Sequence, residues 1–233
     1  MILKALLLNL LLVAATPVEI QVVNFPAKGK TAVSLGAKGK AEVERLATVT
    51  RITIQLDEVQ PTRSALAGMN SYVAWAVSPE GSFENLGELD IAGSKGSLEA
   101  TTRFDRFGIL VTAEPHYMVD RPSFAIMFKN EATRTVRSFP LTIQVGEFDY
   151  KDLPQAVYNI PSLVMEARAA VAIAAAARAE KLAEAEFRQA KVSLDTMEEL
   201  VRRASPLDAI APSAHEAIRR AQRAAAIARQ SAR

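Results

Sequence analysis

The chain has 233 residues, of which 28 are basic and 26 acidic, so its net charge of +2 gives no strong field that would attract nucleic acid. It contains no cysteine, which excludes disulfide scaffolds, thiolate metal sites and a cysteine nucleophile. The length suits one or two domains, each large enough to bury a core of its own.

Residues 1–15 have the pattern of a secretory signal peptide. Lys4 supplies a short basic start, residues 5–13 are apolar apart from one asparagine, and small residues follow at Ala14–Ala15. The apolar run is far shorter than the ~20 residues that cross a bilayer. We therefore predict export and a mature start near Thr16. The alternative is a hydrophobic first strand.

Residues 16–150 show the alternation typical of short strands that have one buried face. Glycine, proline, asparagine and lysine cluster between the alternating segments, as in turns. The apolar sets are Val18, Ile20 and Val22; Ile52, Ile54 and Leu56; Ile109, Val111 and Ala113; Phe124, Ile126 and Phe128; and Leu141, Ile143 and Val145. The pattern predicts an antiparallel, Ig-like β-sandwich over residues 16–150.

One strand in this region is apolar on both faces. It contains the only tryptophan, Trp75, together with Tyr72 and Val77. We expect the strand to lie centrally and these three side chains to belong to the core. The sequence Ser-Pro-Glu-Gly at residues 78–81 fits a type I turn, which predicts a hairpin at this point.

Two prolines and a loss of apolar alternation mark residues 151–161 as a linker. Residues 162–233 are rich in alanine, glutamate and arginine, which are compatible with helix. The sequence leaves open whether residues 162–204 form one helix or two. A capping box, Ser213-Ala-His-Glu216, predicts the start of the last helix. We expect a helical hairpin or a three-helix segment, similar to a coiled coil in its packing.

An apolar stripe runs along the helical part at residues 187–204. Phe187, Leu194 and Val201 recur every seven residues, with Ala190 and Met197 between them. We expect this surface to be covered by the sandwich, by the preceding helical stretch or by another molecule. A second copy of the chain or a neighbouring envelope protein is the partner that we consider for it.

The last helix is basic, with Arg219, Arg220 and Arg223 close together and Glu216 as the one acid after Asp208. Such a helix can dock to an anionic partner such as lipid headgroups or an envelope polymer. Arginines in the last turn also offset the helix macrodipole, which is the structural explanation for the terminal ones.

Several motifs resemble an N-terminal β-domain of bacterial envelope proteins, found especially in acidobacteria. They are Tyr72-Val-Ala-Trp75, Pro79-Glu-Gly81, Asn85-Leu-Gly-Glu88, Phe107-Gly-Ile-Leu-Val-Thr-Ala-Glu-Pro115 and Arg121-Pro-Ser123. The helical part, with Glu166-Ala-Arg-Ala-Ala-Val171 and Phe187-Arg-Gln-Ala-Lys191, resembles DUF4398-like envelope proteins. Many such relatives carry an OmpA-like peptidoglycan-binding domain, and nothing in the printed residues resembles that domain. The resemblance implies an envelope location and an architecture, and no catalytic residues.

The motifs that could carry chemistry are weak. Gly29-Lys30-Thr31 lacks the first glycine of a phosphate-binding loop, whose position is held by Asn24, so a hairpin turn is the better interpretation. We expect His116 to be an exposed loop residue and His215 to lie in the first turn of a helix. No spacing of the two histidines suits a metal site.

Paired carboxylates could support glycoside hydrolysis if the fold joined them across a cleft. The available side chains are Glu88, Asp90, Glu114 and Asp120, which are more simply explained as solvated residues. The sequence therefore favours a non-catalytic exported envelope protein without a cofactor, whose helices contact other envelope components. The alternative is a periplasmic module that binds a carbohydrate or a cell-wall polymer, or has a regulatory role.

Overall fold

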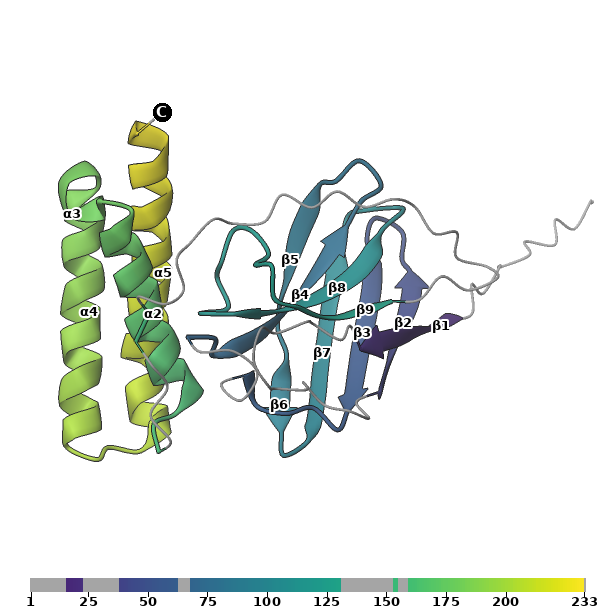
Figure 1. The fold of residues 1–233 in the computed structure, drawn as a ribbon, viewed down its shortest axis with the longest axis horizontal. Helices are drawn as coiled ribbons and strands as arrows, with labels where there is room; N and C mark the ends of the chain where they lie inside the picture. The colour runs from purple at the N-terminus through teal and green to yellow at the C-terminus, as the bar shows by residue number, and fades with distance from the viewer. Residues whose placement is uncertain (1–15, 23–37, 63–67, 131–152, 155–158, 233) are drawn as a thin grey trace, which may run out of the picture.

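The structure, a computed structural model, describes residues 16–22, 38–62, 68–130, 153–154 and 159–232. The expected signal peptide, the turn at residues 29–31 and the strand expected at residues 141–145 lie outside these ranges. Within them the chain forms nine strands and then four helices, with the strands on one side of the molecule and the helices on the other (Figure 1).

All of the strand pairs are antiparallel. The hydrogen-bonded order is β5-β4-β8-β9-β1-β2-β3-β7-β6, which gives two four-stranded sets, β5-β4-β8-β9 and β2-β3-β7-β6, joined through β1. The strands are β1 (Thr16–Val22), β2 (Lys38–Arg45), β3 (Thr50–Asp57), β4 (Ser71–Val77), β5 (Phe83–Glu88), β6 (Asp90–Ala92), β7 (Lys95–Thr102), β8 (Gly108–Glu114) and β9 (Ile126–Asn130). The prediction of antiparallel strands followed by helices is confirmed.

The main hydrophobic cluster draws on both four-stranded sets. In β3 the apolar side chains of Ile52, Ile54 and Leu56 are buried, whereas the alternate residues Arg51 and Gln55 are exposed. This alternation is the period of two that the sequence shows. From the other set, the cluster takes side chains of β4, β8 and β9, among them Tyr72, Ala74, Ile109, Val111 and Phe128.

Strand β4 is buried along its whole length, as its two apolar faces predicted. Tyr72 on one face belongs to the main cluster, and Trp75 on the other belongs to a second cluster with Val73, Val77 and Leu110. The rings of Trp75 and Phe83 of β5 pack edge to face, with their centroids 5.9 Å apart. The amide of Gly81 donates to the carbonyl of Ser78 at 3.0 Å, so the predicted β4–β5 hairpin turn is confirmed.

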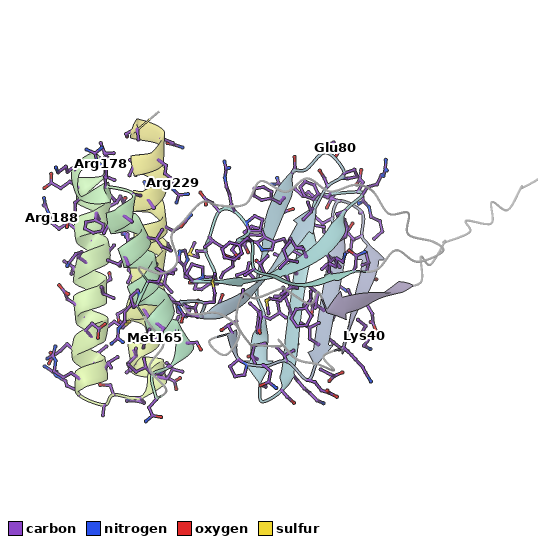
Figure 2. The ribbon with its side chains drawn as sticks, viewed as in Figure 1. Lys40, Glu80, Met165, Arg178, Arg188 and Arg229 are labelled. Atoms are coloured by element: carbon purple, nitrogen blue, oxygen red, sulfur yellow. The ribbon has the colours of Figure 1, made fainter. Side chains whose placement is uncertain are left out.

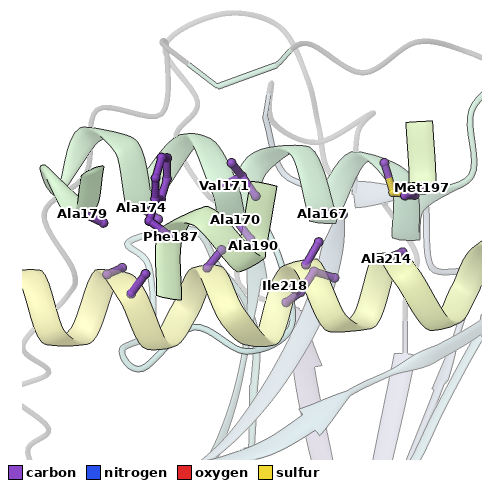
Figure 3. Packing of buried hydrophobic residues seen from close by; sticks show 14 of the residues in the cluster. Ala167, Ala170, Val171, Ala174, Ala179, Phe187, Ala190, Met197, Ala214 and Ile218 are labelled. Atoms are coloured by element: carbon purple, nitrogen blue, oxygen red, sulfur yellow. The ribbon is translucent and has the colours of Figure 1, made fainter. Parts of the chain in front are cut away.

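The helices are α2 (Ser162–Ala176), α3 (Ala179–Leu182), α4 (Glu184–Arg202) and α5 (Leu207–Ser231). Residues 162–204 are not one helix, because Arg178 adopts a left-handed conformation with φ of 63° and interrupts the helix between α2 and α3. Alanine-rich faces of α2 and α5 pack closely against α4, whose buried side chains are Phe187, Ala190 and Met197 (Figure 3). No helix in the described part of the chain is both long enough and apolar enough to cross a membrane.

The predicted start of the last helix is wrong. Helix α5 begins at Leu207 and continues through Pro212, so Ser213 and Glu216 do not cap it. The hydroxyl of Ser213 instead donates to the carbonyl of Ile210 at 2.9 Å. Pro212 has no amide N–H, so the carbonyl of Asp208 loses its helical hydrogen-bond donor. Asp208 is exposed, and water can replace that donor.

Candidate functional site

The segment between β8 and β9, residues 115–125, contacts both the other strands and the helices. On the strand side, the Asn85 side-chain amide donates to the carbonyls of Tyr117 at 2.9 Å and Val119 at 3.0 Å. Tyr117 and Val119 pack against the cluster that contains Trp75, while Tyr117 and Met118 pack against the helical cluster. Tyr117 therefore contacts both hydrophobic cores.

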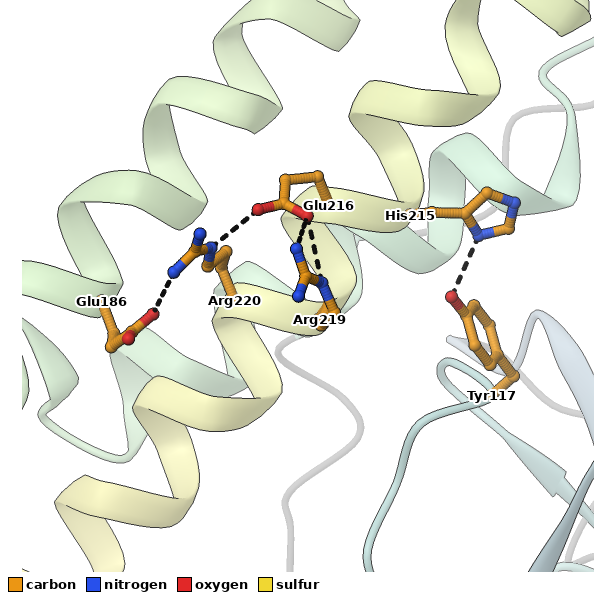
Figure 4. A network of polar contacts seen from close by, with 6 residues as sticks. All are labelled: Tyr117, Glu186, His215, Glu216, Arg219 and Arg220. Atoms are coloured by element: carbon orange, nitrogen blue, oxygen red, sulfur yellow. Dashed lines mark hydrogen bonds and ion pairs between the residues drawn. The ribbon is translucent and has the colours of Figure 1, made fainter.

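Polar contacts fasten this segment to two helices. The amide of Tyr117 donates to Oε2 of Glu166 in α2 at 3.2 Å, and its hydroxyl lies 3.0 Å from Nδ1 of His215 in α5 (Figure 4). Farther along α5, Arg229 donates to both carboxylate oxygens of Asp120, at 3.0 and 2.8 Å. In Figure 2, Arg229 lies on the side of α5 that faces the strands, and Arg188 lies on the outer side of α4.

Two carboxyl groups at the same junction have raised pKa values. They are Glu88, at the end of β5, and Glu166, which is 1% exposed. Burial raises the pKa of Glu88 to about 7, and the neighbouring Asp90 adds to the rise. Burial, and then the charge of Glu88, raise the pKa of Glu166 well above its usual range.

A second buried acid, Glu114, lies within the strands. It accepts hydrogen bonds from the hydroxyl of Thr112 and from the amide of Ser123, the latter at 2.6 Å. The indole N–H of Trp75 donates to the Thr112 oxygen at 2.8 Å, which extends the chain of hydrogen bonds into the apolar core. Burial raises the pKa of Glu114 to about 7, against the lowering effect of its donors.

The expectation of an exposed His116 is wrong, because the side chain is 1% exposed. Its segment is held against the strands by Asn70, whose amide donates to the carbonyl of Pro115 at 2.9 Å. Burial lowers the pKa of His116 to about 4, so the ring is neutral near pH 7, and its Nδ1 has no hydrogen-bond partner. His215 is not in a first turn either, since α5 begins eight residues earlier at Leu207.

The four acids that could have served glycoside hydrolysis lie in different surroundings. Glu114 accepts hydrogen bonds from Thr112 and Ser123, and Asp120 pairs with Arg229, while Glu88 is half-buried and Asp90 is exposed. Among the residues that the structure describes, no group of three or more His, Asp or Glu side chains could hold a metal ion.

The helical stripe packs inside the chain. Phe187 is 5% exposed, and Leu194 and Val201 are partly buried against the cluster that α2 and α5 form with α4. Of the three possible covers, the structure provides the neighbouring helices. The expected core residues Trp75, Tyr72 and Val77 are 0%, 1% and 1% exposed.

The basic cluster of the last helix is partly neutralised, which the sequence did not predict. Arg219 and Arg220 pair with Glu216 on the same helix (Figure 4). Arg220 and Arg223 also pair with Glu186 of α4, at 3.1 and 3.3 Å. The side chains of Arg219 and Arg223 are nevertheless 61% and 68% exposed, so both remain accessible to a partner.

Sequence reasoning missed the junction itself, including Tyr117, Asn85 and Glu166. One signal was present: Glu166 stands in a run that reads Leu-Val-Met-Glu-Ala, where an acid would be buried with the apolar side chains around it. Its partner Glu88 lies in a different part of the chain, and no spacing connects the two.

Comparison of the chain with family models, with curated proteins and with solved structures finds no match. The resemblance to envelope proteins rests on its motifs alone.

Proposed function

We propose that this chain is a non-catalytic, exported cell-envelope protein whose helical segment contacts other envelope components. The observation that carries the proposal is the position of the most perturbed ionisable groups. Glu114 and Glu166 are 1% exposed and accept hydrogen bonds that hold segments of the chain together, and His116 is fully buried and Glu88 half-buried, whereas catalytic groups need access to a substrate. The signal-peptide pattern of residues 1–15 supports export.

The proposal includes a face-to-face packing of the two four-stranded sets as an Ig-like sandwich. It is supported by the main cluster, to which β3 contributes Ile52 and Ile54 and β8 contributes Ile109 and Val111. In protein labelled at the isoleucine, leucine and valine methyl groups, we expect nuclear Overhauser effects between β3 and β8. Cross-peaks confined within each set would contradict the sandwich.

The surface that we propose for the partner is the exposed basic part of α5. The apolar stripe is covered, so Arg219 and Arg223 are better placed to meet an anionic partner, either an acidic envelope protein or an envelope polymer. A carbohydrate-binding role gains no support from Trp75 and Tyr72, because both are buried and cannot stack on a sugar.

Crosslinking in intact cells of the native host tests this role. The double variant Arg219→Gln/Arg223→Gln should lose crosslinked envelope partners, and the matched control Arg188→Gln/Arg203→Gln, whose arginines are each 69% exposed on or beside α4, should keep them. Sequencing of the protein's N-terminus should give a start near Thr16. An intact N-terminus in the cytoplasmic fraction would refute export, and equal crosslinking by both variants would refute the α5 surface.

A further inference from the structure

Strand β1 is the first described element of the chain, yet it lies in the middle of the hydrogen-bonded order, between β9 and β2 (purple in Figure 1). It pairs with β2 at five positions, one of which places Glu19 opposite Lys40. It pairs with β9 at three positions, residues 20–22. In the described part of the chain, the ladder between the two four-stranded sets therefore runs through this seven-residue strand.

The backbone pairing of β1 is uneven along its length. Residues 20–22 have a partner strand on each side, whereas residues 16–19 have register partners on β2 alone within the described ranges. Pro17 lies in that one-sided part, and proline has no N–H to donate to a ladder. By comparison, β3 is paired on both sides at all eight of its residues. Fewer backbone hydrogen bonds therefore oppose the release of β1 than oppose the release of β3.

The strands on either side of β1 are held in place by other contacts. All eight residues of β2 pair with β3, and β9 pairs with β8, next to a hydrogen bond from the Ala113 amide to the Ala125 carbonyl at 2.9 Å. At the far end of the order, the Thr102 hydroxyl of β7 donates to Glu84 of β5 at 2.8 Å, and both sets contribute to the main hydrophobic cluster. Release of β1 therefore leaves a slot one strand wide, with unpaired N–H and C=O groups along both edges.

The connection between β1 and β2 is longer than their pairing requires. Fifteen residues, 23–37, separate these two strands, whereas four residues connect β2 to β3 and five connect β4 to β5. Adjacent antiparallel strands need only about 2–5 residues between them. A chain of about 15 residues can span up to about 50 Å when it is extended, so β1 can reach the same slot in a second molecule.

We propose that β1 exchanges between two copies of the chain, so that each copy inserts its residues 16–22 between β9 and β2 of the other. The partner is a second copy because its strand has the same sequence and register, and every backbone pair of the monomer forms again in the dimer. The basic surface of α5 takes no part in this contact. A strand tethered by a short connection has an effective concentration of about 1 mM, so the dimer forms near that protein concentration.

Disulfide trapping tests the exchange, because the chain contains no cysteine of its own. Two full-length variants, Glu19→Cys and Lys40→Cys, are incubated together in urea below the unfolding midpoint, returned to buffer and oxidised. Residues directly opposite each other in antiparallel strands have Cβ atoms about 4.5–5.5 Å apart, close to the range of a disulfide. A bond between the two variants therefore forms when β1 of one chain lies against β2 of the other.

The expected product is a covalent species with twice the 25.2 kDa mass of the chain. Its yield should increase about threefold as the protein concentration rises from about 0.1 to about 1 mM, as an exchange with a midpoint near 1 mM requires. The fluorescence of Trp75, which is fully buried in the folded chain, confirms that each variant has refolded before it is oxidised.

The matched control replaces Lys40→Cys with Glu44→Cys. The two side chains lie on β2 with similar exposure, 52% for Lys40 and 41% for Glu44. Four residues of strand, or about 14 Å, separate them, so a cysteine at residue 44 is beyond the disulfide range of residue 19. This mixture should give only the background of random collisions, and a yield equal to that of the Lys40→Cys mixture overturns the proposal.

A second variant tests whether self-association requires the release of β1. In Glu19→Cys/Lys40→Cys, oxidation at about 1 µM closes the disulfide within one chain and keeps β1 in its own slot. In sedimentation at about 1 mM, the wild type should approach the mass of a dimer, and the closed variant should stay monomeric until it is reduced. A wild type that is monomeric throughout overturns the proposal. So does a closed variant that dimerises as the wild type does, because association then uses another surface.

Discussion

The hydrogen-bonded chain from Trp75 through Thr112 to Glu114 allows a demanding test of the strand core. Thr112→Val keeps the volume of the side chain and removes its hydroxyl, which leaves two buried groups short of a partner. The indole N–H loses its acceptor, and Glu114 keeps the Ser123 amide but loses the Thr112 donor. An unsatisfied buried polar group costs about 1–3 kcal/mol, so we expect a total loss of about 2–4 kcal/mol in the free energy of unfolding.

Urea unfolding followed by tryptophan fluorescence measures this loss directly, because Trp75 is the only tryptophan and is fully buried. Thr112→Ser is the control: it keeps the hydroxyl and deletes one methyl group, at a cost of about 1 kcal/mol. The reasoning is refuted if Thr112→Val unfolds at the wild-type midpoint, or if Thr112→Ser is as unstable as Thr112→Val.

Three further predictions concern other parts of the molecule. Phe187→Ala should lower the free energy of unfolding of the helical part by about 3–5 kcal/mol, because the ring is buried among α2, α4 and α5. Urea unfolding followed by circular dichroism at 222 nm, about the wavelength of the helix band, measures this loss. A loss below about 1 kcal/mol would mean that the helices do not enclose the ring. Arg178→Gly should stabilise the chain by about 1 kcal/mol in thermal unfolding, because glycine relieves the φ of 63° between α2 and α3, and a destabilised variant would contradict that backbone. Burial raises the pKa of Glu114 to about 7, so the free energy of unfolding should decrease by up to about 3 kcal/mol as the pH rises from 4.5 to 7. Trp75 fluorescence measures this decrease, and Glu114→Gln should flatten the pH dependence. If the variant keeps the wild-type pH dependence, other acids are responsible for it.

Local sequence patterns predicted the buried faces of strands and helices in both halves of the chain. Alternation at Ile52, Ile54 and Leu56 predicted a strand with one buried face, and the two apolar faces of residues 71–77 predicted a strand that is covered on both sides. These patterns are reliable because side-chain direction follows backbone geometry over a few residues. The seven-residue spacing of Phe187, Leu194 and Val201 identified the buried face of α4 for the same reason.

The cover of those faces and the surroundings of the buried acids depend on tertiary packing. Leu194 and Val201 could have faced another molecule, and the structure places α2 and α5 over them. Two local predictions failed where tertiary context overrode the sequence: helix packing continues α5 through Pro212, and hydrogen bonding of the neighbouring backbone holds His116 in the interior. Glu88 and Glu166 are 78 positions apart in the sequence, so the effect of the Glu88 charge on Glu166 depends on how the strands and helices dock. Local patterns describe which face of an element is buried, whereas the surroundings of a buried acid depend on elements that are distant in the sequence.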